Sequence, residues 1–296
     1  MNRKELENLT KNSLEHINFC FDNKLLKKRF ICEVCMNEKR LVATNSIRDG
    51  FVWKCYSRKC SKNTTTIRKD SIFTDFKLPL KTIFFLFYDF AIQTPLNIVQ
   101  KETKLSNVTI TKYFKFCRLL IENYYFCFEN NKKIGGNNKI VEIDECCLFR
   151  RKYNVGRIQN QIWIFGGIER GENGKSFFEK VNNRNAVTLK EVLLRRVESG
   201  TTIISDSWKA YKNLEEMGFQ HFKINHSVNF VNPFFPEINT QKIESTWNTL
   251  RKLIKKKGTN IRKNHSEYLL EFQFRKENKN VFEALLNIIK KTNNFE

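Results

Sequence analysis

The second half of the chain alternates apolar runs of strand length with amphipathic segments of helical period. Apolar runs that predict strands lie at residues 139–149, 161–169, 175–182, 201–206 and 221–225. Segments that predict helices lie at residues 187–199, 207–217, 240–257 and 265–290. Glycines follow two of these helices, at Gly200 and Gly218. The pattern predicts an α/β domain at residues 139–290, in which helices flank a mixed sheet.

The first half of the chain is organised differently. Residues 1–29 are polar and charged and predict a short helix near residues 14–21. Residues 30–75 hold paired cysteines, and residues 76–130 carry apolar side chains at helical spacing. A stretch rich in Asn and Gly at residues 130–139 is the best linker in the chain. We therefore expect three small segments before the α/β domain.

Three acidic residues occupy informative places in the predicted α/β domain. The order of three strands, a helix, a strand, a helix and a strand is that of an RNase H-like fold, in which the first strand lies centrally and pairs with the fourth. Asp144 lies in the first predicted strand, Asp206 ends the fourth, and Glu244 opens the helix at residues 240–257. This topology would place Asp144 beside Asp206, and the late helix would bring Glu244 over them.

Carboxylates grouped in this way are ligands for Mg²⁺ or Mn²⁺. Two such ions about 3.5–4 Å apart can clamp the attacking and leaving oxygens of a phosphodiester. Ordinary alternatives exist, since Asp206 could be a helix N-cap and Glu244 a surface residue of a charged helix. Strand alternation puts Glu142 on the face of Asp144 and Glu145 on the opposite face. We therefore expect Glu145→Gln to leave activity intact.

The charge of the chain points to a polyanionic partner. Its 296 residues include 53 Lys and Arg against 31 Asp and Glu, a net charge of +22. Such an excess suits the phosphate backbone of nucleic acid, although a solubility effect or a lysine-rich genome would also produce it. The residues expected along a DNA track beside the acids are Arg150, Arg151, Lys152, Arg157, Lys252, Lys255, Lys256 and Lys257. For residues 255–257, a solvated helix face is the alternative.

The sequence also predicts where the protein acts. No apolar run approaches the roughly 18 residues of a membrane span, and the first residues lack the apolar core of a signal peptide. The nine cysteines are an odd number, which favours free or metal-bound thiols in a reducing compartment. We expect an intracellular protein without a membrane partner, in the nucleus of a eukaryote or in the cytoplasm and nucleoid otherwise.

Four cysteines form two knuckles. Two residues separate Cys32 from Cys35, four separate Cys55 from Cys60, and 19 lie between the knuckles. Four thiolates from two turns suit tetrahedral structural zinc, and residues 51–53 lead into the second knuckle as a ribbon strand would. The alternative is a group of unligated thiols. The other five cysteines lack this spacing, so we expect most of them to be small buried side chains.

Residues 93–121 have the pattern of a helix-turn-helix. A first helix at residues 93–100 would be followed by a turn near residues 104–106 and a second helix from Asn107. Ser106 is a plausible N-cap. The side chains suited to contact DNA at the start of the second helix are Asn107, Thr109, Thr111 and Lys112. An ordinary helical hairpin is the alternative.

Short motifs extend along the second half in a fixed order. They lie at residues 141–145 (VEIDE), 156–157 (GR), 162–170 (IWIFGGIER), 205–211 (SDSWKAY), 225–233 (NHSVNFVNP), 239–247 (NTQKIESTW) and 268–275 (YLLEFQFR). In order and spacing they resemble DDE transposases of the Merlin superfamily. That superfamily is related to bacterial insertion-sequence transposases with a zinc ribbon and an ISXO2-like transposase domain. The resemblance covers about residues 30–280, including the cysteine knuckles.

The resemblance implies a function and the residues that perform it. Asp144, Asp206 and Glu244 match the family's metal-binding triad, and His226 falls in its Asn-His-Ser turn. The family usually has His five residues before the final acid, where this chain has Asn239. The expected activity is cut-and-paste DNA transposition with two Mg²⁺ or Mn²⁺ ions per active site and a structural Zn²⁺.

The expected partners are the terminal inverted repeats of a transposon and target double-stranded DNA, bound by a homodimer or higher oligomer. Two other functions stay open. One is a domesticated, transposase-derived DNA-binding protein or regulator, and the other is a structure-specific nuclease of the same fold.

Overall fold

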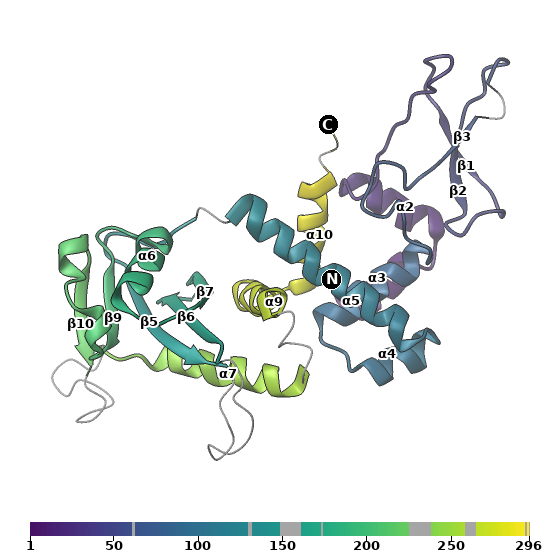
Figure 1. The fold of residues 1–296 in the computed structure, drawn as a ribbon. Coiled ribbons are helices and arrows are strands. Elements are labelled where there is room, and N and C mark those ends of the chain that lie inside the picture. Colours follow the sequence, from purple (N-terminus) through teal and green to yellow (C-terminus); the bar gives the residue numbers. More distant parts are fainter. Residues whose placement is uncertain are drawn as a thin grey trace. The chain divides into compact units, whose positions relative to one another are not determined.

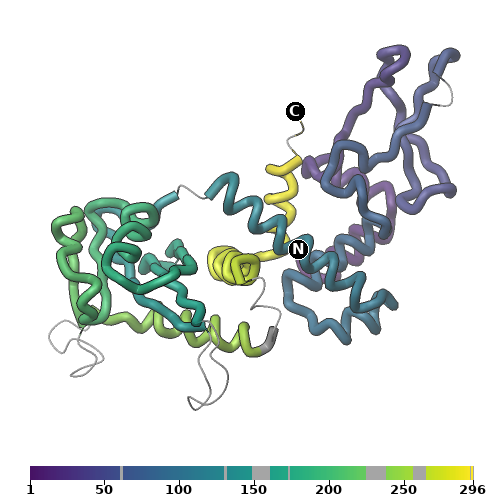
Figure 2. The backbone as a smooth tube through the Cα atoms, viewed as in Figure 1, coloured from purple at the N-terminus to yellow at the C-terminus, as the bar shows by residue number. Residues whose placement is uncertain are grey.

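The chain divides into two compact units, which are described separately. The computed structural model describes residues 1–60, 63–129, 132–148, 161–172, 174–224, 238–257, 265–293 and 295. The first unit combines Met1–Tyr124 with Asn280–Glu296, and the second is Tyr125–Lys279. Figures 1 and 2 show the course of the chain through each unit.

The first unit begins with two short helices, α1 (Arg3–Leu9) and α2 (Ser13–Asp22). Asn2 caps α1, because its side chain accepts from the N–H of Glu5 while the Glu5 carboxylate accepts from the N–H of Asn2. Asn12 caps α2 by accepting from the N–H of Leu14. The helix predicted near residues 14–21 is therefore confirmed as α2.

A three-stranded antiparallel sheet follows, in the order β1 (Arg40–Ala43), β2 (Phe51–Lys54) and β3 (Thr64–Thr66). The strand expected at residues 51–53 is confirmed as β2. The Trp53 side chain is buried between the rings of Phe21 and Phe30, at centroid distances of 5.7 Å and 5.8 Å. Aromatic packing thus joins this small sheet to α2.

A buried ion pair fastens the region after this sheet to the next helix. The Arg68 guanidinium donates to both carboxylate oxygens of Asp49, and it also donates to the carbonyls of Phe76 and Leu78. Asp49 accepts in addition from the N–H of Leu80, at 3.0 Å. Leu80 is the first residue of α3 (Leu80–Ala91), so the Asp49 carboxylate satisfies an N–H that the helix itself leaves unpaired.

The remaining helices of the first unit pack together around aromatic side chains. They are α4 (Leu96–Thr103), α5 (Asn107–Tyr124) and α10 (Val281–Asn293). Phe282 of α10 contacts the rings of Phe84 and Tyr88 of α3, both in edge-on geometry. The sequence placed residues 265–290 in one helix of the α/β domain. Instead the helix breaks after residue 277, Asn280 caps a new helix, and that helix belongs to the first unit.

The second unit is built on a five-stranded sheet in the order β10-β9-β5-β6-β7. The strands are β5 (Ile140–Cys147), β6 (Trp163–Glu169), β7 (Ser176–Val181), β9 (Thr202–Asp206) and β10 (Gln220–Ile224). β5 pairs antiparallel with β6 and parallel with β9. The prediction that the first strand is central and pairs with the fourth is confirmed. A separate short ladder joins β4 (Ile134–Gly135) to β8 (Val197–Glu198).

Helices cover both faces of this sheet (Figure 1). On one face, α6 (Ala186–Arg196) packs its Leu189 and Leu193 against Ile143 and Phe165 of the sheet. On the other face, α7 (Gln241–Lys257) and α9 (His265–Glu277) pack against strand side chains that alternate with those of the first face. The predicted mixed α/β architecture is confirmed.

One predicted helix is wrong. Residues 207–217 form two short 3₁₀ turns, η3 (Lys209–Tyr211) and η4 (Glu215–Met217), rather than one amphipathic helix. Between them Lys212 is extended, with ψ 144°, and Asn213 has a φ of 64°, and neither conformation continues a helix. The turns still bury Tyr211 and Leu214, which explains why the segment has apolar residues at nearly helical spacing. None of the described helices has the length and apolar character needed to cross a membrane.

Candidate active site

Asp144 and Asp206 reach the same edge of the sheet. In the parallel pairing of β5 with β9, Glu142 lies opposite Ile204. Two residues further along the respective strands come Asp144 and Asp206, each near the carboxyl end of its strand. Neighbouring strands are about 4.8 Å apart, and both side chains are half-buried. Asp144 and Asp206 therefore lie near each other at this edge, as the predicted strand pairing implies.

The charge on Asp144 is influenced by both of the other acids. The pKa of Asp144 is raised to about 6, mainly by burial and in addition by the charges of Asp206 and Glu244. The N–H of Glu145 and the indole of Trp247 act in the opposite direction. Trp247 Nε1 donates to Asp144 Oδ2 at 2.9 Å. Mutual repulsion among carboxylates in one small region is what a bound cation would relieve.

Helix α7 carries Glu244 in its first turn. Thr240 immediately precedes the helix, and its hydroxyl donates to Glu244 Oε1 at 2.8 Å. Glu244 and Trp247 are three residues apart on the helix and therefore lie on the same side. Because Trp247 bonds to Asp144, the same side of α7 faces the edge where Asp144 lies.

Two glycines let side chains approach β6 from both faces. A Cβ at Gly166 would lie 2.5 Å from the ring of Trp247 and 2.9 Å from that of Phe178. A Cβ at Gly167 would collide with Phe177, which belongs to the core on the opposite face. The Gly-Gly motif of residues 166–167 therefore has a packing role, and Gly166 in particular gives Trp247 its place.

Glu142 anchors the start of α7 to the sheet. Its Oε2 accepts from the N–H of Ile243 at 3.0 Å, and its Oε1 accepts from Arg170 Nε at 2.7 Å. Arg170 Nη2 in turn donates to the carbonyl and to Oδ1 of Asn239, at 2.6 Å and 3.2 Å. Glu142 is 1% exposed, so the carboxylate at the centre of this network is buried.

The sequence missed this role, although it did place Glu142 on the face of Asp144. Asn239, where the family usually has His, is positioned by Arg170 in this network and accepts from the N–H of Gln241.

Glu145 points to the other face of the sheet. The hydroxyl of Tyr211 donates to its carboxylate. The pKa of Glu145 is raised to about 8, mainly by burial and in addition by the charges of Asp144 and Asp206. The hydrogen bond from Tyr211 acts in the opposite direction. Glu145 is therefore held in a separate environment from Asp144, as strand alternation predicted.

The carboxylates are near one another without forming a tight single-ion cluster. Within the described ranges, only four cysteines form a group of His, Cys, Asp or Glu ligand atoms that all lie within 4.8 Å of one another. Asp144, Asp206 and Glu244 are more widely spread. A site for two ions covers a wider area than a site for one ion, because the ions themselves lie about 3.5–4 Å apart.

Comparison with protein families gives a match to most of the second unit. Residues 137–277 match the model of the ISXO2-like transposase domain. The second unit carries an ISXO2-like transposase domain. The match runs from just before β5 to the end of α9 and includes Asp144, Asp206 and Glu244. The resemblance to DDE transposases is confirmed for this domain. No curated protein shows significant similarity to the chain.

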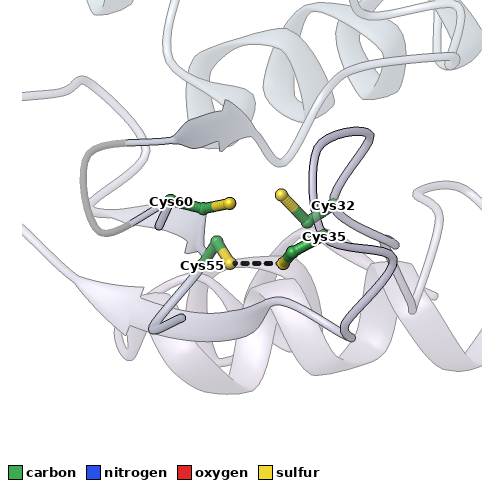
Figure 3. A group of neighbouring side chains, drawn as sticks. All are labelled: Cys32, Cys35, Cys55 and Cys60. Atoms are coloured by element: carbon green, nitrogen blue, oxygen red, sulfur yellow. Dashed lines mark hydrogen bonds between the residues drawn. The ribbon is translucent and has the colours of Figure 1, made fainter. Parts of the chain in front are cut away.

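Outside the transposase domain, the predicted cysteine cluster is present (Figure 3). The ligand atoms of Cys32, Cys35, Cys55 and Cys60 all lie within 4.8 Å of one another. Their sulfur atoms face a common centre, and Cys35 Sγ lies 3.5 Å from Cys55 Sγ. Backbone N–H groups of Cys35 and Val34 lower the pKa of Cys32 to about 6. Four convergent sulfurs with a readily formed thiolate can hold a structural metal ion.

The remaining cysteines are a mixed group. Cys20, Cys117, Cys146 and Cys147 are buried, as expected, and Cys127 is exposed.

Also outside the transposase domain, α4 and α5 are two helices joined by a short turn, and α4 begins at Leu96, after Pro95, rather than at the predicted residue 93. Whether this pair is a helix-turn-helix or an ordinary helical hairpin stays open. Lys104 ends α4 in the left-handed conformation, with φ 56°. Ser106 then caps α5, because its hydroxyl accepts from the N–H of Thr109 at 3.2 Å. The predicted DNA-contacting positions Asn107, Thr111 and Lys112 are exposed, and Thr109 is half-buried. DNA contact at these positions stays a prediction.

The predicted basic track is only partly described. Lys252 and Lys255 are exposed on α7 of the transposase domain. Lys256 and Lys257 complete that helix, but their side chains lie outside the described part of the structure. The positions that fall wholly outside the described residues are Arg150, Arg151, Lys152, Arg157 and His226.

Proposed function

We propose that this protein is a cut-and-paste DNA transposase of the DDE type. The observation that carries the proposal is that Asp144 and Asp206 lie at one sheet edge, beside the helix of Glu244 whose Trp247 bonds to Asp144, inside an ISXO2-like transposase domain. The strand order also supports it. With β5 central and paired to β9, the sheet has the order of an RNase H-like fold. In that fold the ends of these strands are the natural place for such carboxylates.

In this proposal Asp144, Asp206 and Glu244 hold two Mg²⁺ or Mn²⁺ ions, which would activate the attacking oxygen and stabilise the leaving one. The protein's own part is to keep the carboxylates in place. Trp247 orients Asp144, and Thr240 orients Glu244. In the first step water attacks a phosphodiester at the transposon end and a 3′-hydroxyl leaves. In the second step that 3′-hydroxyl attacks a target phosphodiester.

The rest of the chain would bind and position the DNA. A net charge of +22 favours a polyanionic partner. We assign terminal-repeat recognition to the exposed start of α5, and a structural zinc to Cys32, Cys35, Cys55 and Cys60. The exposed Lys252 and Lys255 would contact the backbone near the acids. Acting on two transposon ends would require a homodimer or higher oligomer on the DNA.

The test is a cleavage and strand-transfer assay on DNA that carries the inverted repeats flanking the gene. With Mg²⁺, Asp144→Asn, Asp206→Asn and Glu244→Gln should each abolish cleavage and transfer while leaving DNA binding largely intact. Because the acids act as one unit, losses in double variants should be far from additive. Glu145→Gln is the matched control and should retain activity, since Glu145 faces Tyr211 on the other side of the sheet.

The outcomes separate the candidate functions. Cleavage without joining would indicate a nuclease, and sequence-specific binding without cleavage would indicate a domesticated regulator. A normal cleavage rate in Asp206→Asn would show that Asp206 has no catalytic role.

A further inference from the structure

An arginine in the transposase domain contacts the rings of two tryptophans. Arg184 lies in the loop between β7 and α6. Its guanidinium carbon lies 3.7 Å from the ring centroid of Trp163 and 4.9 Å from that of Trp208. We call these three residues the arginine clamp. Stacking of a guanidinium on aromatic faces restricts its orientation before any ligand arrives.

The strand register places the arginine clamp at the edge of the sheet where the acids lie. Trp163 opens β6 and pairs with Cys147, the last residue of β5. Trp208 follows Asp206 by two residues, and its N–H donates to Asp206 Oδ1 at 3.1 Å. The clamp is therefore near Asp206 and near the strand that carries Asp144.

Arg184 has no acceptor among the described residues. No hydrogen bond or ion pair to its guanidinium occurs in that part of the chain. A guanidinium has five N–H donors, and they lie in the plane of the group. Contacts with the faces of the two rings use none of these N–H donors, which therefore stay available for a ligand. By contrast, Arg170, Arg195 and Arg196 in the same unit each bind a carboxylate.

We propose that the arginine clamp binds a backbone phosphate of the DNA strand next to the bond that is cut. This inference rests on the proposed function, because it takes DNA as the substrate. A planar, half-buried guanidinium matches two phosphate oxygens at once. Asp144, Asp206 and Glu244 are negatively charged and therefore repel the phosphates of a bound DNA strand. A fixed positive charge at the same edge offsets this repulsion where the metal ions do not reach.

The experiment compares the salt dependence of DNA binding in full-length variants. The probe is a blunt duplex of arbitrary sequence, in magnesium-free buffer over a series of salt concentrations. Arg184→Gln should weaken binding and reduce the slope of log affinity against log salt by about 0.9, the value for one lost phosphate contact. Arg184→Lys should keep the slope, because the charge is retained, but bind more weakly than wild type because the two-pronged contact is lost.

Arg195→Gln is the matched control. It removes the same charge from the same domain, but Arg195 is paired with Glu179, so its slope should equal that of wild type. An unchanged slope in Arg184→Gln would overturn the proposal. So would equal reductions in Arg184→Gln and Arg195→Gln, because they would indicate only a general charge effect.

A cleavage assay of the wild type separates this inference from the proposed function. Suppose that the wild type does not cleave DNA, but Arg184→Gln still reduces the slope of log affinity against log salt by about 0.9. Phosphate binding by the arginine clamp is then supported, and the transposase proposal is wrong. If the wild type cleaves and the Arg184→Gln slope is unchanged, only the arginine clamp fails.

Discussion

Three acidic residues within four positions of β5 have three different environments. Glu142 is paired with Arg170 and bonded to the backbone of α7. Asp144 is half-buried near two other carboxylates, and Glu145 is bonded to Tyr211 on the opposite face. A carboxylate with an arginine and a backbone N–H already on its oxygens has little remaining capacity for a metal ion. At the scale of single residues, this favours Asp144 over Glu142 as the proposed metal ligand of the strand.

His16 makes the stability of the first unit depend on pH. It is buried in α2 against Phe84, with ring centroids 4.7 Å apart, and burial lowers its pKa to about 4. The folded protein therefore binds the proton less readily than the unfolded chain, whose His has a pKa of about 6.5. Between those two values, stability falls as the pH falls. From pH 7 to pH 5 this histidine should cost about 2 kcal/mol of unfolding free energy.

The measurement is urea unfolding of wild type and His16→Phe at both pH values. Carboxylates titrate equally in the two proteins, so the difference between their pH dependences isolates the histidine. Equal pH dependence in the two proteins would contradict the assignment.

At the scale of elements, α7 is held by contacts from three strand positions. Glu142 bonds its first turn, Asp144 accepts from Trp247, and Lys242 donates to the carbonyl of Glu169 at 2.9 Å. The helix then buries Ile243 and Leu250 on the sheet. Because Glu244 is on this helix, any change that moves α7 also moves a proposed metal ligand.

Gly166→Ala and Gly167→Ala form a matched pair that tests this dependence. The first adds a methyl group 2.5 Å from Trp247, and the second adds one against Phe177 on the opposite face. Both should destabilise the second unit by about 1–3 kcal/mol through overpacking. Only Gly166→Ala should also raise the Mg²⁺ concentration needed for cleavage, because only it displaces α7. Thermal unfolding and Mg²⁺ titrations of both variants are the measurements, and an equal Mg²⁺ requirement would exclude the link through Trp247.

At the scale of the whole molecule, the two compact units depend on different sources of stability. The second unit has a five-stranded sheet with a core on each face. The small sheet near the cysteines has three short strands and few buried apolar side chains. A region with so little core needs a cross-link or a metal ion to fold.

Metal analysis of the purified protein should therefore find about one zinc per chain. Cys55→Ser should lose the zinc, and the exposed Cys127→Ser should retain it, since Cys127 lies outside the cluster. A chelator should disorder the region around β1–β3 while the transposase domain stays folded, which hydrogen exchange of each unit would show. A metal-free protein with full protection in β1–β3 would contradict the zinc assignment.

Features that depend on local sequence patterns could be predicted from the sequence alone. Strand and helix positions in the second unit follow from periods of two and 3.6 residues, and the knuckle spacing follows from the geometry of a metal-binding turn. The turn at Lys104 and the cap at Ser106 depend only on neighbouring residues. The expected proximity of Asp144 and Asp206 also follows from the sequence, because the order of elements restricts the possible sheet topologies.

Features that depend on contacts between residues far apart in the sequence could be seen only in the folded structure. Glu142 anchors α7 because its carboxylate accepts from the N–H of Ile243, which is 101 positions away in the sequence. The helix at residues 281–293 belongs to the first unit because its Phe282 packs against Phe84 and Tyr88 of α3, a contact that no local sequence pattern predicts. Asn213 interrupted a nearly helical spacing by adopting a left-handed conformation. Arg184 contacts two tryptophans that are far apart in the sequence, Trp163 in β6 and Trp208 just after β9. These features depend on packing between distant parts of the folded chain, and the hydrophobic periodicity of the sequence does not contain that information.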